Sequence, residues 1–451
     1  MNIYLITIDA WRASHASFLP GSEDGLTPNM ASLSPESCVF TEAISHGPAT
    51  PYAFPSLFSS TLPLDICVYE PIAPNLRLLI ESLAAAGVTS IAVHANPWLG
   101  EKYGYARGYS SYQDVGEFSL PLFDTVREIL IDRFGLDHWV YRIAQRVYRR
   151  FQGPLTHLGG DDEVEAVLDR LAAASTTDSN TFLWVHLLTP HAPYTPPKRH
   201  REAVGLTEMA EEPFKLVTRA QQGPHGLSSK ERSIVRRLYA GAVRHADERV
   251  GRLLEVVEDD SLIIITADHG EALFEHGQVG HEPSLYDELL HVPLLIRPPS
   301  GHRNRGIVDS QVRHIDIAPT ILDYAGIDRL KKHRGRTLKP AIEGRGIEDR
   351  IALSEVASTS EQPGRVDPSA LQISVRTPGR KLIHRDDRTI GFDLHADPRE
   401  KQPLREFSGA QWDPLTEILT DRLEEIDFTT AHHTDRDTQA KKRLKELGYI
   451  D

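Results

Sequence analysis

An aspartate and a histidine that could bind a metal stand together where an apolar run of the chain ends. Residues 262–265 are all apolar, and Asp268 and His269 follow closely. Such a run is typical of a buried parallel strand, and open α/β sheets carry their chemistry just beyond the carboxyl ends of strands. Carboxylate and imidazole are both good ligands for a divalent cation. A plain turn explains the pair equally well, but the nearby His276 and His281 favour a site.

Two further strand-like segments end in polar groups. Residues 2–8 lead into Asp9, and residues 181–187 lead towards His191. Because the carboxyl ends of parallel strands meet at one edge of a sheet, these side chains are expected to converge with Asp268. A histidine between prolines can be purely structural, but the position of His191 along the sheet favours substrate binding. Arg12 has two interpretations, a salt bridge to a neighbouring acid, which is the simpler, and a contact to an anionic substrate.

The composition limits the class of protein. The chain has 451 residues, of which 40% are hydrophobic and 25% charged, as in a soluble globular protein with a large and a smaller domain. Its formal net charge of -14 argues against a nucleic-acid partner. The two cysteines exclude a disulfide framework and a thiolate metal site. The start lacks the features of a signal peptide, and no apolar run would span a membrane. The sequence therefore predicts a cytoplasmic protein without a transmembrane segment.

The order of the expected elements indicates an α/β fold. Strand-like and helical segments alternate up to about residue 345, which is the rhythm of a sheet covered by helices. Residues 115–165 break this rhythm and predict a helical insertion. From residue 346 to 451, short polar strand candidates predict a small antiparallel subdomain. Within the first domain, a proline-rich loop after residue 47 is expected to enter a short helix at about Pro55.

These motifs together resemble the sulfatase family, within the alkaline-phosphatase-like superfamily. The similar segments keep the family's order along nearly the whole chain and comprise residues 6–12, 27–30, 189–194, 266–271, 275–281, 285–293, 392–400 and 447–449. The resemblance implies a central mixed sheet sandwiched by helices, with a small C-terminal antiparallel α+β subdomain. It also implies a hydrolase of sulfate or phosphate esters.

The resemblance further implies the roles of particular residues. One divalent metal ion would be held by Asp9, Asp268 and His269. His191 and His281 would bind the ester or protonate the leaving oxygen. Arg12 and His276 are the candidate substrate-binding residues.

The nucleophile position departs from the family pattern. Sulfatases carry Cys or Ser in a Cys/Ser-x-Pro-Ser-Arg signature, and that residue becomes formylglycine. The aligned stretch here is 53–57, with Ala53 at the nucleophile position and Leu57 in place of the arginine. Three explanations remain: Thr50 is the nucleophile, the metal activates a water, or the site binds without turnover. Because three residues of loop span up to about 10 Å, Thr50 serves only if the loop is shifted.

The metal ligands depart from the calcium-type pattern as well. That pattern has adjacent acids after the first strand and Asp-Asn in the later motif. Here Ala10 follows Asp9, and His269 replaces the asparagine. Imidazole suits zinc or manganese better than calcium, so zinc or manganese is preferred and calcium or magnesium is the alternative. The change points towards the phosphoester or phosphonate-ester side of the superfamily.

The sequence therefore predicts a metal-dependent hydrolase of a small anionic ester, for which a saccharide or an envelope building block is a candidate. One alternative is a transferase that moves a phospho-substituent onto a glycan or envelope precursor. The other is a degenerate binding protein, favoured by Ala53 and opposed by the intact metal ligands. Nothing in the sequence indicates an oligomeric state.

Overall fold

The computed structural model describes residues 1–23, 25–66, 71–116, 164–169, 180–209, 211–300, 306–357 and 370–426. The helical insertion predicted at 115–165 lies almost entirely outside these residues, and so does the segment 447–449. In the part of the chain that is described, no helix is long and apolar enough to cross a membrane.

A nine-stranded mixed sheet forms the centre of the molecule, with the order β10-β2-β9-β6-β1-β5-β3-β4 and β11 paired to β2. Strand β1 lies between β5 and β6 and runs parallel to both, whereas β9 runs antiparallel to β6 and β2. This confirms the predicted mixed sheet. The strands are β1 (Asn2–Ile8), β2 (Cys38–Ile44), β3 (Thr89–His94), β4 (Ser111–Asp114), β5 (Thr181–Leu187), β6 (Ser261–Ala267), β9 (His291–Arg297), β10 (Gly306–Val308) and β11 (Val312–Arg313).

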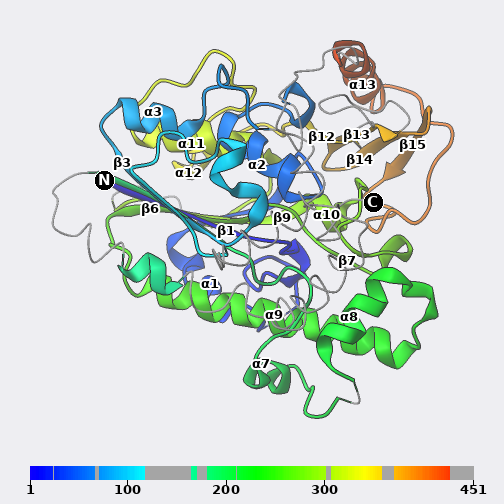
Figure 1. Ribbon diagram of the computed structural model, residues 1–451. Helices are drawn as coiled ribbons and strands as arrows, with labels where there is room; N and C mark the ends of the chain where they lie inside the picture. Colours follow the sequence, from blue (N-terminus) through cyan, green and yellow to red (C-terminus); the bar gives the residue numbers. More distant parts are fainter. Residues whose placement is uncertain are drawn as a thin grey trace, which may run out of the picture.

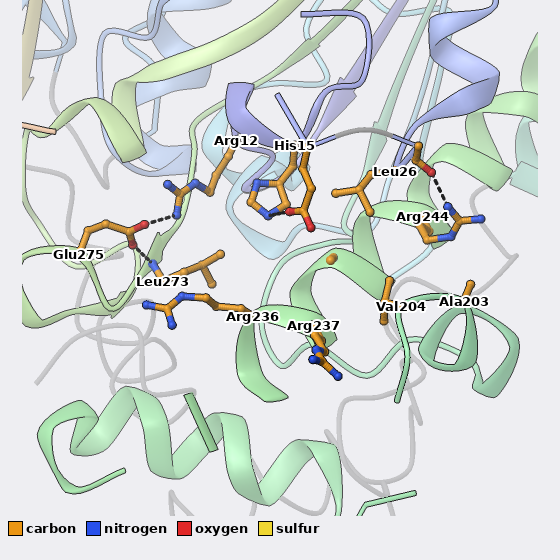
Figure 2. Close-up of a pocket in the computed structure, with 13 residues that line it drawn as sticks. Arg12, His15, Leu26, Ala203, Val204, Arg236, Arg237, Arg244, Leu273 and Glu275 are labelled. Carbon is orange, nitrogen blue, oxygen red and sulfur yellow. Dashed lines mark hydrogen bonds and ion pairs between the residues drawn. The ribbon is translucent and has the colours of Figure 1, made fainter. Parts of the chain in front are cut away.

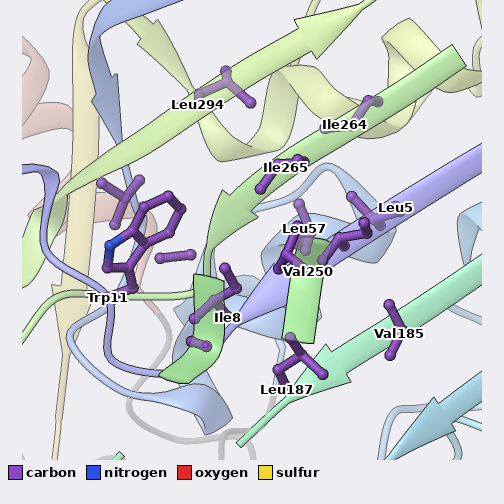
Figure 3. Close-up of a cluster of buried hydrophobic side chains, with 14 of the residues drawn as sticks. Leu5, Ile8, Trp11, Leu57, Val185, Leu187, Val250, Ile264, Ile265 and Leu294 are labelled. Carbon is purple, nitrogen blue, oxygen red and sulfur yellow. The ribbon is translucent and has the colours of Figure 1, made fainter. Parts of the chain in front are cut away.

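Helices cover both faces of this sheet (Figure 1). One face carries α1 (Pro28–Ala31) and the long α9 (Ser229–Leu254), against which α7 (Lys198–Ala203) and α8 (Pro213–Gln222) pack. The other face carries α2 (Thr50–Ser59), α3 (Leu79–Ala85), α11 (Ile317–Tyr324) and α12 (Lys339–Ile342). Because both faces are covered, the central strands are apolar almost throughout; Leu5, Ile264 and Val185 lie in one buried cluster with Leu57 and Val250 (Figure 3).

Helix α2 begins earlier than the sequence predicted. It starts at Thr50 rather than at about Pro55, and Pro55 lies inside it. Pro51 is compatible with this start, because the first N–H groups of a helix have no intrahelical partner. The backbone N–H of Ala53 already donates to the Ala49 carbonyl, 3.0 Å away. The prolines therefore belong to the helix itself and not to a loop that precedes it.

A second, smaller sheet follows in the chain. Its four antiparallel strands are β12 (Ala352–Val356), β13 (Gln372–Thr377), β14 (Arg380–Arg385) and β15 (Arg388–Asp393). Helix α13 (Asp413–Glu425) packs Leu415 and Leu419 into a cluster with this sheet. The predicted small antiparallel C-terminal sheet is confirmed, and the exact division at residue 345 stays a prediction.

Buried ion pairs join the two sheets through α10 (Asp287–Leu290). Lys381 of β14 is fully buried, with its Nζ 2.7 Å from Asp287 Oδ1 and 2.8 Å from Glu400 Oε1. Arg376 of β13 contacts Asp287 and also Glu42 of β2, each at 2.8 Å. Although burial alone would raise the pKa of Asp287, Arg376 and Lys381 hold that pKa well below its usual range. Asp287 is therefore the anion on which both cations depend.

We expect Asp287→Asn to lower the free energy of unfolding by about 3–5 kcal/mol, because it removes the anion that the buried Lys381 and Arg376 share and leaves each cation with one carboxylate. Chemical denaturation followed by circular dichroism measures this change. Glu202→Gln is the matched control, since Glu202 pairs with Lys198 at an exposed site. Its effect should stay below about 1 kcal/mol. Equal effects of the two variants would contradict the importance of the buried network.

Candidate active site

Four neighbouring parallel strands bring polar side chains to one edge of the large sheet. Asp268 follows β6, Asp9 follows β1, His186 lies near the end of β5, and Asn96 follows β3. All four side chains are buried. Asp9 and Asp268 lie at the same edge of the sheet, as the strand pattern predicted. Neither His186 nor Asn96 was predicted.

Asp9, Asp268 and His269 form a cluster with unfilled ligand positions. His269 Nε2 lies 3.6 Å from Asp9 Oδ1 and 3.5 Å from Asp268 Oδ2. His269 Nδ1 donates to the Gly270 carbonyl at 2.8 Å, which leaves the lone pair on Nε2. Burial also lowers the pKa of His269 and so favours its neutral form. Among the described residues, Asp9 Oδ1 and His269 Nε2 have no hydrogen-bond partner. Unpaired buried acceptors are costly, so this donor set fits a divalent cation.

Backbone groups hold Asp268 in place. Its Oδ1 accepts hydrogen bonds from the N–H of Ala10 at 3.2 Å and from its neighbour His269 at 2.8 Å. Ala10 adopts a left-handed φ of 56°, which is uncommon for alanine and turns its N–H towards the carboxylate. Gly270 is required because an added Cβ would lie 2.1 Å from the Glu288 carbonyl oxygen. The left-handed backbone at Ala10 and the absence of a side chain at Gly270 therefore hold the cluster in place.

His186 is oriented by a threonine on the neighbouring strand. Thr7 Oγ1 lies 3.0 Å from His186 Nδ1 and donates to the Val185 carbonyl at 3.3 Å. When the hydroxyl proton goes to Val185, His186 Nδ1–H donates to Thr7 and the lone pair on Nε2 is left for a cation. Nε2 lies 3.2 Å from Asp9 Oδ2. The ligand atoms of Asp9, His186 and Asp268 all lie within 4.8 Å of one another, which suits His186 to share a cation with them. No sequence signal marked His186, because it occupies an ordinary strand position.

The hydroxyl of Thr50 lies within this cluster. Thr50 Oγ1 donates to Asp268 Oδ2 at 2.9 Å and accepts from Asn96 Nδ2 at 3.2 Å, while Asn96 also donates to Asp9 Oδ2 at 2.7 Å. Thr50 is the first residue of α2, and Ala53 lies one turn further along. Because the helix begins at Thr50, the Thr50 hydroxyl lies in the cluster, although the family signature aligns its nucleophile with Ala53.

Two of the predicted histidines lie beside the metal-ligand candidates. The ring centroid of His281 is 4.6 Å from that of His269 and 4.9 Å from that of His191. His281 Nδ1 is 2.8 Å from Glu271 Oε2, and Tyr194 donates to the other Glu271 oxygen. Burial alone would lower the pKa of His281, but the Glu271 carboxylate raises it to about 9. His281 is therefore suited to donate a proton.

The structure does not bring Arg12 and His276 into this hydrogen-bonded cluster. Arg12 forms a salt bridge of 3.0 Å with Glu275, which agrees with the simpler interpretation of this residue. His276 stacks on Tyr286 with ring centroids 3.6 Å apart, and its Nε2 is 3.6 Å from Glu288. Substrate binding by Arg12 and His276 stays a prediction.

Comparison with known families identifies the class of protein. The family described as Sulfatase matches residues 1–327, and N-sulphoglucosamine sulphohydrolase, C-terminal, matches residues 275–428. The chain therefore belongs to the sulfatase family. It is 31% identical over 218 residues to the N-acetylglucosamine-6-O-sulfatase of Bacteroides thetaiotaomicron. The matched region covers 47% of this chain and 38% of that protein. The chain spans about two fifths of the length of the first curated relatives that it matches.

Solved structures of low sequence identity share the fold. The phosphonate monoester hydrolase of Agrobacterium radiobacter superposes with a TM-score of 0.70 at 20% identity, covering 94% of this chain and 95% of that chain. The structure of BT4656 in complex with its substrate D-glucosamine-2-N,6-O-disulfate gives a TM-score of 0.67 at 17% identity and covers 99% of both chains. These similarities confirm the alkaline-phosphatase-like fold.

We expect Asp268→Ala to lose its bound metal, because the carboxylate is one of the ligand candidates, and to keep the fold, because the central strands pack through apolar side chains. Metal content after purification, measured by elemental analysis, tests this. Asp387→Ala, at an exposed turn of the small sheet, is the control. Unchanged metal content in Asp268→Ala would refute the assignment.

A separate prediction concerns the orientation of His186. Thr7→Val keeps the shape of residue 7 but removes the oxygen that orients the imidazole, so metal affinity should fall by about 10–100-fold. Thr7→Ser keeps the oxygen and should restore most of that affinity. Titration with a competing chelator measures both. Equal affinity in Thr7→Val and the unchanged protein would exclude His186 as a ligand held by Thr7.

Proposed function

We propose that this protein is a metal-dependent hydrolase of sulfate or phosphate esters that uses Thr50 as its nucleophile. The observation that carries the proposal is the position of the Thr50 hydroxyl, which lies at the start of helix α2 and donates to Asp268 at 2.9 Å. Membership of the sulfatase family supports the reaction class.

The surroundings of Thr50 prepare its oxygen for attack. Asp268 accepts the hydroxyl proton, and Asn96 donates to the same hydroxyl oxygen and so favours negative charge on it. The attacking oxygen would form a bond to sulfur or phosphorus while the bond to the leaving alcohol breaks. The positive end of the α2 dipole lies beside this oxygen and favours the negative charge of the transferring group.

The candidate ligands are Asp9, Asp268, His269 and His186, whose ligand atoms lie together in the cluster. A divalent cation bound there supplies positive charge that lowers the pKa of a nearby hydroxyl and stabilises the charge of the transferring group. Zinc or manganese is preferred over calcium or magnesium, because two of the four candidates are imidazoles.

In this proposal, the oxygen of the leaving alcohol receives its proton from one of the two histidines, His191 and His281, that lie next to each other. His281 is held protonated by Glu271, and its ring lies near that of His191. We assign His281 as the general acid and His191 as the residue that orients the ester. A second attack, by water, would then release sulfate or phosphate from Thr50.

The acceptor in this second step separates hydrolase from transferase, since a sugar hydroxyl could replace water without any change in the first step. Sulfated saccharides are the first substrates to test, because the relative from Bacteroides thetaiotaomicron is an N-acetylglucosamine-6-O-sulfatase. Phosphonate monoesters are the second class, from the Agrobacterium radiobacter neighbour. The cytoplasmic location predicted from the sequence stays a prediction, which cell fractionation tests.

We expect Thr50→Val to reduce kcat at least about a thousand-fold, because the nucleophile is lost, while Thr50→Ser retains turnover. Steady-state assays on aryl sulfate, aryl phosphate and phosphonate esters measure this, and mass spectrometry of quenched reactions detects a group attached to residue 50. Full hydrolysis by Thr50→Val would exclude Thr50. A gain of activity only in Ala53→Ser would instead indicate a disabled enzyme.

Glu271→Gln tests the general acid. Without the carboxylate, His281 loses its counter-ion, so kcat should fall for esters with poorly leaving alcohols and change little for an activated nitrophenyl ester. The ratio of the two kcat values is the readout. An equal loss on both esters would indicate that Glu271 only maintains the structure.

A further inference from the structure

A cavity of about 430 Å³ lies between helix α9 and the loop that follows β1 (Figure 2). Its walls are the middle of helix α9, the end of α7, the loop that follows β1, and the hairpin at Leu273 and Glu275. This volume falls within the range of about 300–1,000 Å³ that is typical of small-molecule sites. Apart from the substrate binding predicted for Arg12, none of the roles described above involves the residues that line it.

Arginine dominates the lining of this cavity. Arg236, Arg237 and Arg244 come from α9, and Arg12 comes from the loop after β1, whereas the acidic residues among the described residues of the lining are Glu23 and Glu275. Burial, together with Arg12, lowers the pKa of the lining His15 to about 3, so this histidine adds no charge. The cavity is therefore locally cationic in a chain whose net charge is -14.

Several of these guanidinium groups have unused hydrogen-bonding capacity. Within the described part of the chain, the buried Nε atoms of Arg12 and Arg244 have no hydrogen-bond partner. No carboxylate lies within 4.0 Å of Arg236, Arg237 or Arg244 in that part of the chain, so only Arg12 is neutralised, by Glu275. A planar guanidinium that lacks a carboxylate is well suited to a sulfate or phosphate oxygen.

The same backbone segment forms a wall of both the cavity and the active site. Tyr239 of α9 donates to the Ala10 carbonyl at 2.7 Å and accepts from the Arg12 N–H at 3.1 Å. The N–H of Ala10 in turn donates to Asp268. On the other side, strand β7 (Ala272–Leu273) links Glu271 of the active site to the hairpin of the cavity. The cavity and the active site therefore share backbone segments on two sides.

The hairpin is held against α9 by cation–π contacts. The guanidinium groups of Arg232 and Arg236 lie 5.3 Å and 5.0 Å from the ring centroid of Phe274. Phe274 and His276 both adopt left-handed φ values, of 79° and 49°, which place Glu275 against Arg12. Such uncommon backbone conformations often occur at functional sites, and here they shape the wall of the cavity.

We propose that this cavity binds a second oxyanion, a sulfate or phosphate group at the end of the substrate remote from the scissile ester. The inference rests on the proposed function in that it assumes an ester substrate in the neighbouring site. It names the substrate class more closely, as esters that carry at least two anionic groups. Arg236 and Arg237 are the exposed contacts that recognise the remote group, and Arg12 and Arg244 form the inner wall.

Binding is measured by calorimetry on the metal-loaded full chain carrying Thr50→Val, which prevents turnover. The probes are a tetrasaccharide sulfated on every sugar and the same tetrasaccharide with one terminal sulfate. Adding R236M and R237M should weaken binding of the first probe at least about ten-fold and leave binding of the second unchanged. Inorganic sulfate and inorganic phosphate, used as separate competitors, show which oxyanion the cavity prefers.

Arg388→Met is the matched control, because Arg388 is exposed on β15 of the small sheet. It should change the affinity for either probe by less than about two-fold. Equal affinity of the double variant and its parent for the polysulfated probe would overturn the proposal, and so would an equal loss for both probes. If the unmodified enzyme hydrolyses no ester but the double variant still loses affinity for the first probe only, the proposed function fails and the oxyanion site stands.

Discussion

Two completely buried carboxylates, Asp9 and Asp268, face a neutral imidazole at one edge of the central sheet, and the rest of the site depends on this arrangement. Buried negative charge is costly unless it is compensated. Part of the compensation comes from the chain, through Asn96, the Thr50 hydroxyl and two backbone N–H groups. Asp9 Oδ1 and His269 Nε2 stay unpaired in the described structure, and a divalent cation is the group that would satisfy both.

The sheet makes this costly arrangement available. Strand β1 lies between β6 and β5, so the residues at the ends of these strands must meet whatever their separation in sequence. The apolar strands and the helices on both faces enclose the edge of the sheet so that Asp9 and Asp268 are completely buried. In such surroundings the interaction of charged groups is stronger than in water, which is the condition for both metal binding and the polarisation of an ester.

The nucleophile that we propose, Thr50, lies three residues before the position that the family signature gives. The match to the signature at Ala53 leaves a methyl group where a reactive atom is needed. Helix α2 begins at Thr50, and this start places a hydroxyl at the helix terminus beside Asp268. The proposed chemistry therefore needs no modified cysteine or serine. In the proposed first step, Asp268 takes the proton of the Thr50 hydroxyl, and the oxygen attacks either a sulfate or a phosphate ester.

Much of this protein could be predicted from the sequence alone. Apolar runs that end in Asp9 and Asp268 indicated parallel strands with a shared edge, because the ends of neighbouring strands meet wherever the sheet is continuous. The short polar strands after residue 345 indicated the small antiparallel sheet, which the structure confirms.

The tertiary structure alone decided the partners of these residues. His186 looks like any strand residue until Thr7 of the neighbouring strand is seen to orient it. The sequence pattern predicts a loop at Thr50, because Pro51 and Pro55 are usual signals of a break, but the segment packs over the sheet as a helix. Arg236 and Arg237 are ordinary solvent-facing residues of a long helix by pattern. They line a cationic cavity because the loop after β1 and the hairpin at Glu275 fold against α9, and contacts between segments so distant in sequence have no local signal.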